Sequence, residues 1–191
     1  MEDFRLADLI NPEFYIAGHN IGIYVVLFIV FAETGLFAGF FLPGDSLLFL
    51  SGIYSTALMK EFIYIPNDFL NVTALASLVA FAGILGNTFG YWFGMKSGTY
   101  LFQKEDSWIF KKKYLYESQA FFEKHGGRAI IFARFLPIIR TFTPIIAGVA
   151  RMNVKKFMLF NIISSILWSF SLIYAGHYLY RILLDNYDVD L

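Results

Sequence analysis

One apolar segment of this chain, residues 129–150, reads AIIFARFLPIIRTFTPIIAGVA and holds two arginines and two prolines. Proline lacks the backbone N–H and clashes with the preceding turn of a helix, so Pro137 and Pro144 are expected to break a helix here. A second apolar segment, residues 20–59, is interrupted by LPGD at residues 42–45. Both segments are therefore predicted to contain helices that break inside the apolar zone.

The composition indicates that the chain folds in lipid. Of its 191 residues, 58% are hydrophobic, 20% are aromatic and 16% are charged, which is more apolar than an ordinary soluble domain. Residues 69–95 and 157–180 contain no Asp, Glu, Lys or Arg, and each is long enough to cross a bilayer as a helix. The glycines within residues 86–94 are expected to allow close helix packing. We therefore predict an all-α integral membrane protein with two full crossings.

The composition also disfavours several classes of function. Lys plus Arg equal Asp plus Glu at 15 each, so no basic surface suits a nucleic acid. The chain has no cysteine for thiolate catalysis or metal binding, and its first twenty residues lack the pattern of a signal peptide. The three histidines, His19, His125 and His177, have no metal-ligand spacing, and such histidines are more often structural or interfacial. We expect no enzyme activity, no metal and no cofactor.

The charges of the loops predict an orientation, because cytoplasmic loops are enriched in Lys and Arg. Residues 96–128 hold seven Lys or Arg, and Arg151, Lys155 and Lys156 form a second basic cluster. Both clusters face the cytoplasm only if residues 129–150 enter the membrane and turn back. The two tails and residues 60–68 are net negative, and all of them then lie outside. We therefore predict re-entrant hairpins.

This arrangement treats residues 1–191 as a single membrane domain made of two inverted halves. The first half, 1–105, has its hairpin at 20–62 and its crossing at 69–95; the second, 106–191, has its hairpin at 128–150 and its crossing at 157–180. FAE at 31–33 and FAR at 132–134 open the two hairpins alike, and inverted repeats with broken helices recur in transporters. The aromatic and lysine-rich residues 108–125 are predicted to form an interfacial helix, with a solvated loop helix as the alternative.

Four charged residues lie inside the apolar segments: the acids Glu33 and Asp45 in the first hairpin, and the bases Arg134 and Arg140 in the second. A charge at the bilayer centre costs at least ~2.5–3.5 kcal/mol, so these side chains are expected to face each other, a cavity or a ligand. On a continuous helix the two acids would lie about 18 Å apart. A break at Pro43 and Gly44 can bring them to one point.

The two arginines predict a phosphate-binding site. They are six residues apart, and the break at Pro137 can turn both guanidinium groups into one cavity. Each planar guanidinium can donate two parallel hydrogen bonds to phosphate oxygens, and broken helix ends also bind anions. The alternative is a static ion-pair network that holds the hairpins together, although buried ion pairs often stabilise no more than apolar packing does.

The motifs form one pattern along nearly the whole chain. Its positions are Glu33, residues 41–45, Gly86, Gly90, Tyr91, Gly94, Phe121, Phe122, residues 125–127, residues 134–137, Arg140, Pro144, Ala147, Gly148, Met152, Phe157, Asn161 and Trp168. This pattern resembles the DedA family of bacterial inner-membrane proteins, which is related to eukaryotic proteins with a VTT domain. Asn87 departs from an acid found in many members, and Ser164 departs from glycine.

The resemblance implies a multi-pass protein of the bacterial inner membrane that returns undecaprenyl phosphate to the cytoplasmic leaflet, and it leaves coupling to protons open. The family's essential residues fall on Glu33, Asp45, Arg134 and Arg140. The implied partners are membrane lipids, a polyprenyl phosphate and protons, with a homo-oligomer also left open.

Functions of different classes remain open from the sequence. In a lipid-phosphate flippase, the arginines would hold the phosphate, and the acids would compete for them or carry protons, which couples the two ligands. In a proton-coupled exporter of small cations or drugs, Glu33 and Asp45 would form the substrate site and the arginines would tune their pKa. The sequence is also compatible with general phospholipid scrambling and with a non-transporting scaffold.

Overall fold

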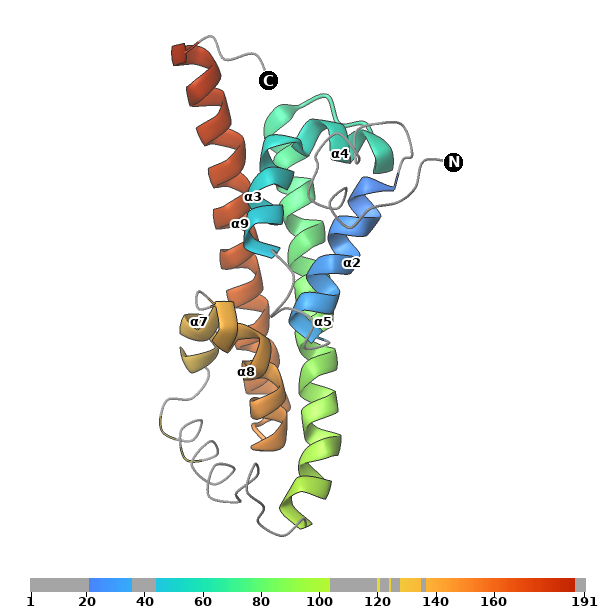
Figure 1. Cartoon of the computed structure of the whole chain (residues 1–191), viewed down its shortest axis with the longest axis vertical. Helices are drawn as coiled ribbons and strands as arrows, with labels where there is room; N and C mark the ends of the chain where they lie inside the picture. Colours follow the sequence, from blue (N-terminus) through green and yellow to red (C-terminus); the bar gives the residue numbers. More distant parts are fainter. Residues whose placement is uncertain are drawn as a thin grey trace. The chain divides into compact units, whose positions relative to one another are not determined.

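The computed structural model of the protein describes residues 21–35, 44–103, 120, 124, 128–134 and 137–187. Every element bounded within these residues is a helix (Figure 1), as predicted. The helices are α2 Gly22–Gly35, α3 Gly44–Ile53, α4 Ser55–Phe62, α5 Asp68–Gln103, α7 Arg128–Arg134, α8 Pro137–Val149 and α9 Val154–Tyr187. The predicted break at Pro43 lies outside the described residues, as does nearly all of the predicted interfacial helix 108–125.

Two helices are long enough to cross a membrane. Helices α5 and α9 have 36 and 34 residues, which correspond to about 54 and 51 Å at 1.5 Å per residue. Both contain an apolar stretch that could span a bilayer, at Asp68–Ser97 and Val154–Ile182, and these stretches include the predicted crossings. Large apolar side chains such as Phe81 and Leu159 are exposed on them, which is the surface expected of helices in contact with lipid.

Asparagine side chains cap both long helices at their first turn. The Asn67 Oδ1 accepts a hydrogen bond from the Leu70 N–H at 3.0 Å. The Asn153 Oδ1 accepts from the N–H groups of Lys155 and Lys156 at 3.0 and 3.2 Å. Such a cap satisfies N–H groups that have no partner inside the helix and contributes about 1 kcal/mol. The local sequence therefore sets where each long helix begins.

A tight turn joins α8 to α9. The Met152 N–H donates to the Ala147 carbonyl, and the Arg151 N–H donates to the Gly148 carbonyl, each at 3.0 Å. Arg151 has a φ of 53°, so it occupies the left-handed position that closes a Schellman motif. This closure ends α8 and reverses the chain within four residues.

The contacts divide the chain into two compact units. Unit 1 contains Met1–Ile29, Pro43–Val79 and Ser169–Leu191, and unit 2 contains Val30–Leu42 and Ala80–Trp168. Helices α2, α5 and α9 each contribute residues to both units. The units therefore do not follow the predicted halves of the chain, and the inverted repeat of re-entrant hairpins stays a prediction.

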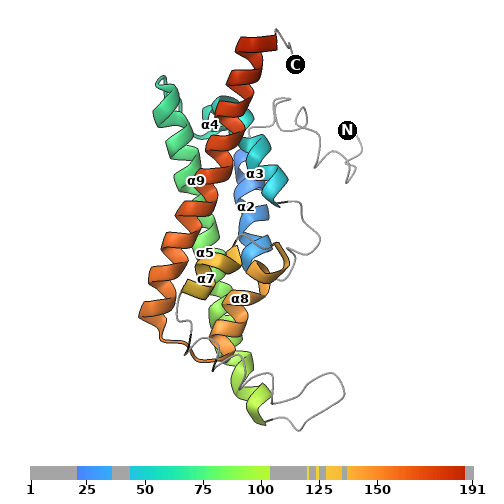
Figure 2. The same ribbon diagram turned by 90° about the vertical axis from the view of Figure 1, so that its left-hand side faces the viewer.

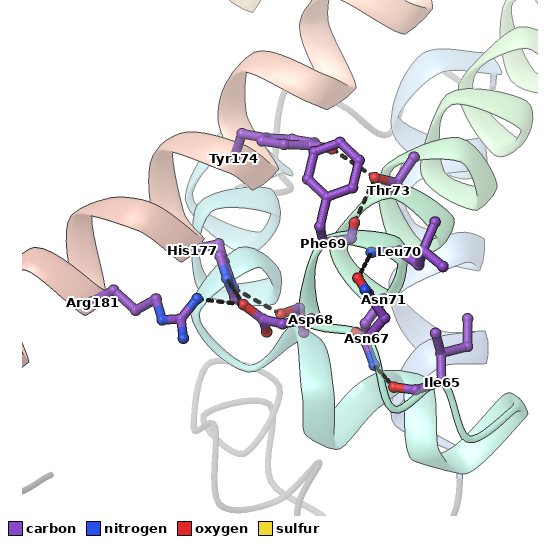
Figure 3. A network of polar contacts seen from close by, with 11 residues as sticks. Ile65, Asn67, Asp68, Phe69, Leu70, Asn71, Thr73, Tyr174, His177 and Arg181 are labelled. Atoms are coloured by element: carbon purple, nitrogen blue, oxygen red, sulfur yellow. Dashed lines mark hydrogen bonds and ion pairs between the residues drawn. The ribbon is translucent and has the colours of Figure 1, made fainter.

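Polar contacts join the start of α5 to the end of α9 in unit 1 (Figure 3), and a further contact joins α4 to α9. The Asp68 carboxylate accepts from Arg181 Nη1 at 2.5 Å and contacts His177 Nε2 at 3.0 Å. The other ring nitrogen of His177 lies 3.1 Å from the Ser55 hydroxyl. His177 therefore has a hydrogen-bond partner on both sides, which fits the structural role predicted for it.

Glycines on one face of α5 allow close packing in unit 2, as predicted for residues 86–94. A Cβ at Gly86 would overlap the Thr34 hydroxyl of α2, and a Cβ at Gly94 would overlap the Ile145 carbonyl of α8. From the other side, a Cβ at Gly148 of α8 would overlap the α5 backbone. Figure 2 shows α8 lying along α5. Because glycine has no side chain, the backbones of α2 and α8 lie very close to that of α5 at these points.

The predicted break at Pro144 is wrong, because α8 runs through this residue from Pro137 to Val149. A proline inside a helix loses only one backbone hydrogen bond, and helices packed against neighbours tolerate that loss. Here Pro144 packs beside Gly90, where an added Cβ would lie 3.4 Å from the proline Cβ. The break predicted at Pro137 agrees with the structure, since α7 ends at Arg134 and a separate helix begins at Pro137.

Candidate functional site

The centre of the site is a buried ion pair between α2 and α8. Arg140 Nη2 donates a hydrogen bond to Glu33 Oε1, and both side chains are almost inaccessible to solvent. The two residues are 107 positions apart in the chain. The fold therefore joins one of the predicted acids to one of the predicted arginines.

Trp168 of α9 brings the two arginines together. The guanidinium carbon of Arg134 lies 4.6 Å from the centre of the Trp168 ring, and that of Arg140 lies 5.0 Å from it. Both distances suit a cation–π interaction, which contributes about 2 kcal/mol or more in a desolvated site. That is comparable with the ~2.5–3.5 kcal/mol cost of placing a charge in the membrane interior. The tryptophan thus offsets much of the cost of holding a second cation beside the ion pair.

The backbone of α5 passes directly against Arg134. A Cβ at Gly83 would come within 2.7 Å of Arg134 Nη2, so any larger residue at position 83 would displace this guanidinium group. Arg134 and Arg140 are respectively 3% and 6% exposed. Both predicted arginines are therefore buried, and both lie against the ring of Trp168.

A small pocket opens beside the arginines. Its empty space, including the part that is open to solvent, is about 170 Å³, and it is lined by Asn87, Ile130, Arg134, Arg140, Thr143 and Pro144. Its interior leaves room for about one water-sized molecule. A phosphate group would therefore require the lining side chains to move apart.

A pair of buried amides supports the pocket from α5 and α9. Asn87 Nδ2 donates to Asn161 Oδ1 at 2.7 Å. Asn161 Nδ2 donates to the Ile84 carbonyl at 3.2 Å, and the Ser165 hydroxyl donates to Asn161 Oδ1 at 3.2 Å. These bonds fix the side chain of Asn87 at the edge of the pocket.

The remaining predicted residue, Asp45, lies in unit 1. It is half-buried in the first turn of α3, next to Gly44, which begins that helix. A carboxylate there interacts favourably with the positive end of the helix dipole. Its predicted pairing with the arginines stays a prediction.

Trp168 and the Asn87–Asn161 pair are functional candidates that the sequence reasoning did not assign a role. The two asparagines carried a usable signal, because amides inside apolar crossings must be hydrogen-bonded when they are buried. Trp168 carried no signal beyond its place in the family pattern, since an aromatic residue in a membrane helix is ordinary. Its contact with two arginines arises from packing alone.

Known proteins resemble this chain over most of its length. The VTT domain profile matches residues 22–178. Protein DedA of Escherichia coli is 38% identical over 177 residues, which are 92% of this chain and 74% of that protein. An uncharacterized membrane protein of Mycobacterium tuberculosis is 40% identical over 178 residues, 91% of this chain and 74% of its own length.

Inner membrane protein YqjA of Escherichia coli is 35% identical over 160 residues, which are 82% of this chain and 67% of that protein. No solved structure matches the chain. A domain match over most of the chain, two membrane-length helices and buried charges in apolar segments agree with one another. The chain therefore belongs to the DedA family of membrane proteins.

Proposed function

We propose that this protein is a transporter that moves a lipid phosphate between the leaflets of a membrane. The observation that carries this proposal is the pocket lined by Arg134 and Arg140, because buried arginines bind phosphate through paired hydrogen bonds. The substrate we infer is a polyprenyl phosphate such as undecaprenyl phosphate, returned to the cytoplasmic leaflet. On this proposal the protein transports its lipid without chemical change and is not an enzyme.

The ion pair supplies a mechanism for releasing the phosphate. Glu33 and a phosphate compete for the same guanidinium, that of Arg140. When phosphate binds, the carboxylate loses its cation, and a buried carboxylate without a cation binds a proton more readily. Phosphate binding and proton binding are then coupled.

The same geometry argues against a cation exporter. The pocket is lined by both arginines, whereas Glu33 is held by Arg140. A cationic substrate would enter against two positive charges. General phospholipid scrambling differs from the proposal only in selectivity, so the transport experiment separates the two.

The transport experiment uses the purified chain in liposomes. Transbilayer movement of a fluorescent polyprenyl phosphate is compared with that of phosphatidylcholine and with the flux of a monovalent cation. We expect the polyprenyl phosphate to move at least tenfold faster than the phospholipid, because one hydrogen bond to a charged group contributes about 1.5–3 kcal/mol. Equal rates for both lipids indicate a scramblase, and a cation flux alone contradicts the proposal.

We further infer that the protein is a multi-pass protein of the bacterial inner membrane with two re-entrant hairpins. Helices α2, α3, α7 and α8 have 14, 10, 7 and 13 residues, and each is shorter than the roughly 20 residues needed to cross a bilayer. The name of the relative YqjA as an inner membrane protein agrees with the location. Lipids and protons are the partners that this proposal requires.

Single cysteines test the hairpins, and the native chain has no cysteine to interfere. A cysteine at Tyr64, which is exposed, should react with a membrane-impermeant reagent in intact cells. Cysteines at Ser107 and Asn153 should react only after the membrane is opened, because both flank a hairpin that returns to the cytoplasm. Labelling of Asn153 from outside while Ser107 stays protected would show that residues 129–150 cross the membrane.

A further inference from the structure

Asn87 presents a buried hydrogen-bond acceptor to the arginine pocket. Its side chain is 2% exposed and lines the pocket together with Arg134 and Arg140. Its Oδ1 has no hydrogen-bond partner among the described residues. Buried polar atoms in native proteins are nearly always hydrogen-bonded. An acceptor left open beside two cationic donors therefore points to a ligand that carries its own donor.

The orientation of this amide follows from its neighbours. The Ile84 carbonyl can only accept a hydrogen bond, so Asn161 must direct its Nδ2 toward it, at 3.2 Å. Asn161 Oδ1 then faces Asn87, which must donate through its own Nδ2, at 2.7 Å. The bond from Ser165 to Asn161 Oδ1 agrees with this assignment. Asn87 is therefore left with its oxygen, and not its nitrogen, for a ligand.

We propose that the pocket binds its lipid head group as the monoanion of a phosphate monoester, with Asn87 Oδ1 accepting the hydrogen bond of the P–OH group. This inference rests on the proposed function. The arginines can only donate hydrogen bonds, and the unprotonated phosphate oxygens can only accept them. One P–OH group is present in the monoanion of a monoester. It is absent from the dianion and from an ionised phosphodiester such as phosphatidylglycerol.

Charged and polar side chains from several helices surround the pocket. Among the described residues, α2 contributes Glu33, α7 contributes Arg134 and α8 contributes Arg140, while α9 contributes the uncharged Asn161 and Ser165. The titratable Tyr91 of α5 donates its hydroxyl to the Met152 carbonyl at 2.5 Å. In the proposed complex the unprotonated phosphate oxygens accept from the two arginines, and the P–OH group donates to Asn87.

The experiment compares a short polyprenyl phosphate with its monomethyl ester, which keeps one negative charge and the same chain but has no P–OH group. Binding to the purified full chain in detergent is measured from pH 5.5 to pH 8. We expect the wild-type protein to bind the monoester about tenfold more tightly at the acidic end, because one hydrogen bond is lost with the methyl group. The preference should shrink above about pH 6, where the monoester loses its second proton. The affinity for the monomethyl ester should stay the same across this pH range.

Asn87→Leu should bring the two lipids to within about twofold of each other at pH 5.5. Asn71→Leu is the matched control. Like Asn87, Asn71 lies on α5, is 2% exposed and has an Oδ1 without a partner among the described residues. Unlike Asn87, it belongs to unit 1 and does not line the pocket. This control should keep the wild-type preference. Equal binding of both lipids by the wild-type protein, or an unchanged preference in a folded Asn87→Leu variant, overturns the inference alone. Failure of both lipids to bind overturns the proposed function and the inference together.

Discussion

Replacing Arg140 by glutamine is expected to lower the free energy of unfolding by about 3–5 kcal/mol, because it leaves the carboxylate of Glu33 buried without its cation. Glu33 is fully buried, so water cannot take the place of the guanidinium. Thermal and denaturant unfolding of the purified protein in detergent measures the loss. Glu33→Gln should also be destabilising, since it removes the anion from a buried cation.

The double variant Glu33→Gln with Arg140→Gln should recover much of this loss, because neither charge is then unpaired. Arg181→Gln is the control. It removes the exposed ion pair with Asp68, whose two side chains are 58% and 39% exposed, and such pairs contribute about 0–1 kcal/mol. Recovery of folding in the double variant without recovery of lipid transport supports the proposed function. Recovery of both would show that this pair is a static support.

Arg134→Lys should weaken binding of a polyprenyl phosphate by about tenfold to a hundredfold while the protein stays folded. Lysine keeps the charge near Trp168 but lacks the planar fork that donates two parallel hydrogen bonds to phosphate. The expected loss corresponds to one charge-assisted hydrogen bond of about 1.5–3 kcal/mol. Lipid binding is measured in detergent, with unfolding followed in parallel.

Arg128→Lys is the matched control for this variant, because Arg128 begins the same short helix but is exposed. It should bind the lipid as the wild-type protein does. If Arg134→Lys also binds normally, then the charge alone is sufficient at this position, and the static network becomes the better account of the arginines.

Much of the fold follows from local sequence patterns. Residues 69–95 and 157–180 predicted the long helices, because an apolar run of that length has one stable form in lipid. Their starts at Asn67 and Asn153 also depend only on neighbouring residues. The predicted break at Pro144 was wrong, because α8 continues through this proline. Pro144 packs against Gly90 of α5, and a contact with another helix cannot be read from the local sequence.

The candidate site followed only in part. The cost of charge in an apolar segment singles out Glu33, Asp45, Arg134 and Arg140 without any structure. The partner of each charge depends on which helices meet, and that depends on glycine faces such as those at Gly83 and Gly86. The orientation of the Asn87 amide depends on a carbonyl supplied by Ile84 and a side chain supplied by α9.

The sequence by itself determined that this protein belongs in lipid, has two membrane-length helices and carries four charged residues in its apolar segments, because hydropathy, helix length and desolvation cost are properties of single segments. Only the tertiary structure decided that Arg140 pairs with Glu33, that Trp168 lies against both arginines and that Asn87 lines the same pocket with its nitrogen bonded to Asn161. These contacts join residues up to 107 positions apart. These contacts form because the glycines of α5 have no side chains, so that α2, α7 and α8 can pack close to α5 and their polar side chains can meet.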